Sequence, residues 1–415
     1  MSPLVLPIFA QALSVVIGAR SEVRLRADAT GRFVDIADTG QVALNLKLRR
    51  TSWTLAYAPS LTQTGVGSDT PGRYLVHWAG LSLRLRLTPR TTVMWSENAT
   101  YGEQNFRIQT VSVPPPTIGN GAVGGASGSG SSTVNPAPAV SNSGQSNAAA
   151  MAATGNNTIR FGSLSNNLNV QYVLAHRWTA GALASYTLMG ELDSYVPVLL
   201  PRMRAYQAGL QLTHAASRRD TITLESDTNY TLIEPNAKSE IVSATVTGIH
   251  TLNRRAFVTA FGSGYYVHFV DLSGNRSSAV LPGTGASFTT AFALPPRPSR
   301  LTVTTTASIA PLIDYRYGGV NNLATVNAAF AWADRPVSLQ VGGSAARSVG
   351  SFGAVTILSV YALTETLGYQ LDRRNHWLVT VGSRQAKQTY AAGPQLPLVW
   401  VAFAAISYTT GILPL

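Results

Sequence analysis

The chain has 415 residues, of which 45% are hydrophobic and only 12% are charged, and its formal net charge is +12. A typical soluble domain has about 25% charged residues, so this composition argues against an ordinary globular protein. No unbroken run of about 18 apolar residues follows the N-terminal segment, which excludes a helical membrane protein. The chain contains no cysteine, which excludes disulfides, zinc-thiolate sites and cysteine catalysis.

The N-terminal segment is apolar from Leu4 to Ala19. Such a stretch is typical of the hydrophobic part of a secretory signal, although no basic residues precede it. We therefore interpret residues 1–19 as a signal peptide or its remnant. A first strand or an anchoring helix is the alternative interpretation.

Beyond this segment, apolar and polar residues alternate along many short stretches. Clear examples are residues 41–48, 81–87, 167–174 and 206–213. A period of two places alternate side chains on opposite faces of a strand. A first strand is expected near residues 20–28, and the last two near 376–390 and 396–410. No long segment shows a 3.6-residue period, so the sequence predicts an all-β protein.

The connections between these strands also alternate in length. Short basic turns recur about every 36 to 43 residues, and longer, more variable loops lie between them. One interval is longer because it contains residues 112–158, a low-complexity segment without charged residues that is expected to be a flexible loop. Alternating short turns and long loops are typical of outer-membrane barrels.

The sequence therefore predicts a transmembrane antiparallel up-and-down β-barrel of about 18 strands (16–18). Its short turns would be periplasmic and its long loops extracellular. Residues 20–415 would form this single barrel in the outer membrane of a Gram-negative bacterium. A soluble propeller also repeats at about 40–45 residues, but it would not require aromatic residues fixed at the turns.

Aromatic and basic residues mark the short turns. Aromatic residues form girdles at the membrane interfaces of such barrels, and we expect the periplasmic girdle to contain Trp53, Trp178, Phe257, Phe292, Trp332 and Trp377. The arginines would form a periplasmic rim that contacts lipid headgroups or an acidic partner, and that explains much of the net charge without nucleic acid. The rim residues are Arg49, Arg50, Arg90, Arg177, Arg218, Arg219, Arg254, Arg255, Arg297, Arg335, Arg373 and Arg374.

Charged residues within the strands are candidates for the lumen wall. Barrels of 16 to 18 strands enclose water, so charges on the inner face can stay hydrated. They could be ordinary pore lining, or a basic wall that attracts an anionic permeant. The candidates are Arg24, Arg26, Lys47, Arg84, Arg86, Glu225 and Asp227.

No motif for catalysis, cofactor binding or metal binding is convincing. The G-x-G-x-x-G match at residues 119–124 lies in the low-complexity segment and lacks the strand and helix that would support it. The six histidines show no metal-ligand spacing. We expect no enzyme, no cofactor and no metal site.

In size, strand number and its one long polar insertion, the chain resembles the roughly 18-stranded outer-membrane barrels of myxobacterial-type polysaccharide export pathways. The resemblance is architectural, so no site residue follows from it. It implies a pore that translocates a secreted polysaccharide, with a periplasmic export protein as a partner at the basic turns and outer-membrane lipid around the barrel. The alternatives are a passive diffusion porin for small anionic solutes and a surface adhesin or structural barrel.

Overall fold

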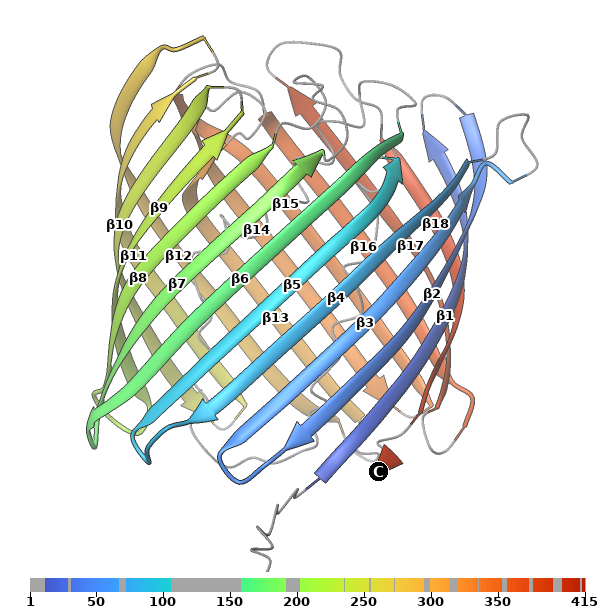
Figure 1. The fold of residues 1–415 in the computed structure, drawn as a ribbon, viewed down its shortest axis with the longest axis horizontal. Helices are drawn as coiled ribbons and strands as arrows, with labels where there is room; N and C mark the ends of the chain where they lie inside the picture. The colour runs from blue at the N-terminus through green and yellow to red at the C-terminus, as the bar shows by residue number, and fades with distance from the viewer. Residues whose placement is uncertain are drawn as a thin grey trace, which may run out of the picture.

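The computed structural model describes residues 12–28, 31–66, 72–105, 158–191, 202–234, 236–253, 255–271, 273–294, 299–313, 320–334, 336–352, 357–372, 376–390, 398–410 and 413–414. Nearly all of these residues lie in strands (Figure 1). Within the described residues, none forms a helix long and apolar enough to span a membrane. The strands are β1 (Ala12–Asp28), β2 (Gly31–Lys47), β3 (Thr51–Thr64), β4 (Gly72–Arg86), β5 (Thr91–Asn105), β6 (Thr158–Ala175), β7 (Trp178–Glu191), β8 (Met203–Ala215), β9 (Asp220–Ile233), β10 (Ala237–Asn253), β11 (Ala256–Val270), β12 (Arg276–Leu294), β13 (Ser299–Ile313), β14 (Val320–Asp334), β15 (Val337–Phe352), β16 (Ile357–Gln370), β17 (Trp377–Tyr390), β18 (Val399–Thr409) and β19 (Leu413–Pro414).

Each strand from β1 to β18 pairs antiparallel with its neighbour in sequence, and β18 pairs with β1 to close the sheet. The predicted antiparallel barrel of about 18 strands is therefore confirmed. The closing pair joins Gly18–Ala27 to Trp400–Thr409. The two-residue β19 adds a short pairing to the lower part of β1. A closed sheet has no free edge, so every central backbone group can find a partner without water.

The first strand begins earlier than we expected. Ala12–Ala19, which we interpreted as part of a signal segment, form the lower half of β1 and pair with β2. The alternation of Leu13, Val15 and Ile17 with smaller residues suits a strand whose outer face is apolar. Residues 1–11 of the predicted signal segment lie outside the described residues.

The two faces of the sheet differ in chemistry. On β1, Val23 and Leu25 are exposed on the outer face, whereas Glu22 and Arg26 lie buried on the inner face. Directly paired residues share a face. The inner or outer face of each residue on the other strands therefore follows from the pairing register, starting from β1. An exposed apolar outer face on a closed antiparallel barrel is the arrangement that lipid requires. The chain is therefore an outer-membrane barrel.

A compact apolar cluster packs on the inner side of the wall. Met203, Ile233, Ile241, Val267 and Phe269 belong to it, and they come from the neighbouring strands β8 to β11. All five lie at the strand ends that face the long connections. The inner wall of β8 to β11 thus carries an apolar cluster near its extracellular end, and the charged residues Glu225 and Asp227 lie farther down β9.

Candidate functional site

The strand register places all seven candidate lumen residues on the inner face. Lys47 ends β2, and Arg84 and Arg86 end β4, so these three lie near the periplasmic mouth. Arg24 and Arg26 lie on the upper half of β1. Glu225 and Asp227 lie near the middle of β9.

A cluster of charged side chains surrounds Glu22 on this inner face. Glu22 is only 2% exposed, and its carboxylate accepts hydrogen bonds from Arg20 (Nη2 to Oε2, 2.6 Å) and Arg24 (Nε to Oε1, 2.6 Å). Arg384 of β17 lies 3.7 Å from the same carboxylate and rests on the ring of Phe403. We call Arg20, Glu22, Arg24 and Arg384 the basic cluster. Three guanidinium groups share one carboxylate, so the cluster carries a net charge of +2.

A second ion pair lies directly above the basic cluster. Arg26 contacts Asp35 of β2 at 3.3 Å, and both side chains are almost fully buried. Asp35 also accepts a hydrogen bond from the backbone N–H of Gly65 at 3.0 Å. The Arg26 guanidinium stacks over Phe33, 4.6 Å from the ring centroid. This pair is neutral and fixes the wall beside the cluster without adding net charge.

An acidic pair lies on the opposite wall. Glu225 and Asp227 are two residues apart on β9, so both side chains point inward. Asp227 is 8% exposed, and its Oδ1 has no hydrogen-bond partner among the described residues. Ser243 of β10 is the direct neighbour of Asp227.

The basic cluster and the acidic pair face each other across the lumen. In a ring of eighteen strands, β9 is half-way round from β18, which lies between the cluster's strands β1 and β17. Figure 1 shows β9 and β1 on opposite sides of the barrel. Positive charge on one wall and negative charge on the other create an electric field across the lumen.

Five of the six expected girdle aromatics point outward near the periplasmic ends of their strands. Trp53, Trp178, Phe292 and Trp377 are 38–48% exposed, and Trp332 is half-buried. Phe257 differs, because it pairs with Thr251 and Thr289 on the inner face. Val258, which pairs with His250, takes the outward position instead. Trp178 also stacks against His214, with ring centroids 4.1 Å apart.

The rim arginines lie at the short turns where the structure describes them. These are Arg49, Arg50, Arg90, Arg177, Arg218, Arg219 and Arg255, whereas Arg254, Arg297, Arg335, Arg373 and Arg374 lie outside the described residues. In the turn after β16, Asp372 accepts a hydrogen bond from the backbone N–H of Trp377 at 2.9 Å. This bond holds the pKa of Asp372 below its usual value.

Sequence reasoning missed four residues of these inner clusters: Arg20, Glu22, Asp35 and Arg384. The signal for two of them is visible in the sequence, because Arg20, Glu22, Arg24 and Arg26 follow one another at every second position. Asp35 and Arg384 meet β1 only through strand pairing across a turn and across the closing seam. Such partners cannot be identified before the register is known.

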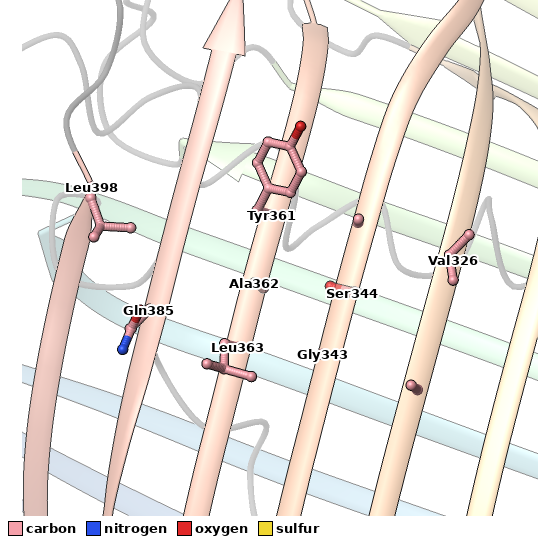
Figure 2. Close-up of a pocket in the computed structure, with 10 residues that line it drawn as sticks. Val326, Gly343, Ser344, Tyr361, Ala362, Leu363, Gln385 and Leu398 are labelled. Atoms are coloured by element: carbon pink, nitrogen blue, oxygen red, sulfur yellow. The ribbon is translucent and has the colours of Figure 1, made fainter.

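The described outer surface is hollowed in places. One hollow, of about 380 Å³, lies over β14 to β17 and is lined by Val326, Tyr361, Leu363 and Gln385 among others (Figure 2). The register places these side chains on the lipid-facing side.

The described residues contain no group of three or more His, Asp or Glu residues that could hold a metal ion. The inner face therefore remains the candidate site.

Comparisons with known proteins identify similar barrels but no family. No protein-family model matches the chain, and no curated protein matches it. Among solved structures, OccK2 (OpdF) of Pseudomonas aeruginosa in complex with glucuronate has a TM-score of 0.48 at 10% identity, covering 98% of this chain and 99% of that one. OpdK of the same organism has a TM-score of 0.48 at 8% identity, with 97% and 99% covered.

CdiB from Acinetobacter baumannii has a TM-score of 0.43 at 10% identity, and the match covers 95% of this chain. The present chain spans only 60% of the length of CdiB. At such identities no residue role passes from one protein to another. The fold of this chain is established by its own strand pairing.

Proposed function

We propose that the protein is a passive diffusion pore for small anionic solutes. The observation that carries this proposal is the net positive basic cluster on the inner face of β1 and β17. Arg84, Arg86 and Lys47 add positive charge near the periplasmic mouth of the same half of the barrel. Confined between low-dielectric walls, such charges raise the local concentration of anions.

The geometry favours attraction without tight binding. Glu22 occupies part of the hydrogen-bonding capacity of Arg20 and Arg24, and Arg384 lies against Phe403. These contacts keep the arginine side chains against the wall and leave a positive field in the lumen. A permeant must be attracted but also released, and weak, distributed contacts meet both needs.

The polysaccharide-export role that the sequence analysis placed first is not favoured by any contact among the described residues. A periplasmic export partner likewise remains a prediction, which rests on the basic turns alone. The adhesin alternative depends on extracellular loops, most of which lie outside the described residues. The diffusion pore is therefore our leading proposal.

Ion selectivity in planar bilayers tests the proposal directly. The refolded protein should conduct, and its reversal potential in a KCl gradient should show a preference for chloride. Arg24→Gln should move the permeability ratio toward unity, because it removes one of the three guanidinium charges. Arg218→Gln, at a periplasmic turn, should change the ratio much less. A cation preference, or no conductance from correctly folded protein, would contradict the proposal.

Liposome swelling separates this role from polysaccharide export. Small mono- and dicarboxylates should swell liposomes that contain the protein faster than neutral sugars of similar size. Selective entry of long neutral oligosaccharides, with no preference among small solutes, would instead support export.

A further inference from the structure

The outer face of the barrel carries a carboxylate within its lipid-facing band. Asp38 lies near the middle of β2 and pairs directly with Ser21 of β1 and Leu61 of β3. Its neighbours along the strand on the same face are Ile36 and Gly40, followed by Val42, and none of them is polar, whereas Asp38 itself is exposed. Ser21 donates a hydrogen bond to its Oδ1 at 2.6 Å. Ionisable groups at membrane depth are costly and usually have a partner.

An imidazole group lies two strands away on the same outer face. His77 of β4 pairs with Pro59 of β3, which shares the outward orientation of Leu61. The hydroxyl of Tyr57 lies 2.6 Å from Nδ1 of His77. If this hydroxyl donates to Nδ1, the ring proton lies on Nε2, which can then donate to an acceptor outside the barrel.

Asp38 and His77 lie at nearly the same depth in the membrane. The register row from Asp38 through Leu61 reaches Leu75 of β4. For strands tilted by about 40°, crossing two strands along this row raises the position by roughly 6 Å. His77 lies two residues below Leu75 on β4, which lowers the position by about 5 Å. The tilt and the order of β2, β3 and β4 can be followed in Figure 1.

This face is also hollowed beside Asp38. A recess of about 470 Å³ is lined by Asp38, Gly40, Pro59, Leu61 and Tyr408, together with neighbouring residues of β1, β4, β17 and β18. Its lining includes the small residues Gly40 and Ser21, so side chains of another protein could enter it. Small and polar residues at membrane depth are typical of contacts between transmembrane elements.

We propose that the outer face of β1 to β4 is the interface between two copies of this chain. A twofold axis along the membrane normal leaves every residue at its own depth. A residue on one side of the axis in one copy therefore faces a residue of the same depth that lies on the other side of the axis in the second copy. With the axis running outside the barrel, next to Leu61 on the outer face of β3, Asp38 of each copy faces His77 of the other. The face is self-complementary, because it offers both an acceptor and a donor at one depth.

A second copy explains this surface better than lipid does. Acyl chains offer no hydrogen bond to a carboxylate, and headgroups lie outside the apolar band. The opposite wall provides a contrast, since Leu224 and Val246 of β9 and β10 are exposed apolar residues on the outer face. The dimer would place two separate lumens side by side and does not depend on what passes through them.

Disulfide cross-linking tests the dimer, because the chain has no cysteine of its own. Leu61→Cys lies close to the proposed axis, whereas Val246→Cys lies on the opposite wall of the barrel. After oxidation in intact outer membranes, Leu61→Cys should form a band at twice the monomer mass, and Val246→Cys should not. Both variants must first show the mobility shift on heating that marks a folded barrel.

Equal cross-linking of the two variants would overturn the proposal. An adduct of Leu61→Cys with a different protein would overturn it as well. Adding Asp38→Ala to Leu61→Cys should lower the dimer yield severalfold, whereas the outward-facing control Ser226→Ala should leave it unchanged. An unchanged yield with Asp38→Ala would exclude the pairing of Asp38 with His77 and the orientation that we propose.

Discussion

A single carboxylate organises the charged part of the inner wall. Glu22 is almost fully buried, and it lies within hydrogen-bond or ion-pair distance of three arginines. Removing one partner from a buried ionic network leaves uncompensated charge, which is more costly than breaking an exposed pair. Glu22 is therefore both a structural residue and the reason why Arg20 and Arg24 lie along the wall.

We expect Glu22→Gln to lower the free energy of unfolding by about 3 kcal/mol. The glutamine keeps the shape of the side chain but leaves three guanidinium groups without their counter-ion. The midpoint of urea unfolding in detergent micelles, followed by tryptophan fluorescence, measures the loss. Glu103→Gln is the matched control, because its pair with Arg160 at 3.2 Å is exposed on both sides.

Glu103→Gln should lower the free energy of unfolding by less than about 1 kcal/mol, because exposed ion pairs usually contribute no more than that. Similar losses for the two variants would mean that the contacts of Glu22 contribute little to stability.

The spacing of Arg20, Glu22, Arg24 and Arg26 allows their common face to be predicted from the sequence. Arg384, which lies 3.7 Å from the carboxylate of Glu22, is more than 350 residues away along the chain, and only the closed barrel brings it close.

At the scale of a strand, β1 matters most because it is paired on both edges, with β2 on one and with β18 at the closing seam on the other. It pairs along its length with β2 and over ten residues with β18. The lower half of the strand contains Ala12–Ala19, which composition alone does not distinguish from a secretory signal. A short apolar stretch is compatible with either role, and only its pairing partners decide between them.

Two truncations test this boundary. A chain that lacks residues 1–11 keeps all of β1 and should refold from inclusion bodies into a barrel that migrates faster unheated than boiled. A chain that lacks residues 1–19 loses the lower half of β1 and should fail to close. Refolding in detergent makes the result independent of export. Equal folding of both chains would show that Ala12–Ala19 are dispensable.

Most strands were predictable from the sequence because they have one lipid-facing and one water-facing side. This alternation identified β4 and β8, and the basic turns gave the repeat from which about 18 strands follow. The face of Phe257 was predicted wrongly, because its place beside a basic turn was taken as a girdle position, whereas the alternation along β11 puts it on the inner face. Nearness to a turn does not determine which face of the sheet a residue occupies, whereas the period of two along its own strand does.

For the molecule as a whole, the two charged walls should act in opposite directions on permeant ions. Glu225→Gln combined with Asp227→Asn removes negative charge from β9 and should increase the preference for chloride. Arg24→Gln should have the reverse effect. Reversal potentials of the two variants, measured in the same salt gradient, provide the comparison. If both variants shift selectivity in the same direction, the opposed walls do not control ion passage.

The overall architecture was predictable, but the arrangement of charge across the lumen was not. Sequence periodicity assigned Arg24 and Glu225 to an inner face, yet it could not show that their strands lie on opposite sides. That follows from the number of strands between β1 and β9 and from the closure of β1 on β18. A different number of strands between β1 and β9, or a sheet that did not close, would no longer place the two charged groups opposite each other.

The closing seam also determines when the charged wall can exist. Arg20, Glu22 and Arg24 come from β1, and Arg384 comes from β17, close to the other end of the chain. A chain released early from the ribosome, or one halted during insertion, cannot complete the cluster or the ring around it. The basic cluster therefore forms only when the barrel closes. An incompletely assembled molecule does not place an anion-attracting pore in the membrane.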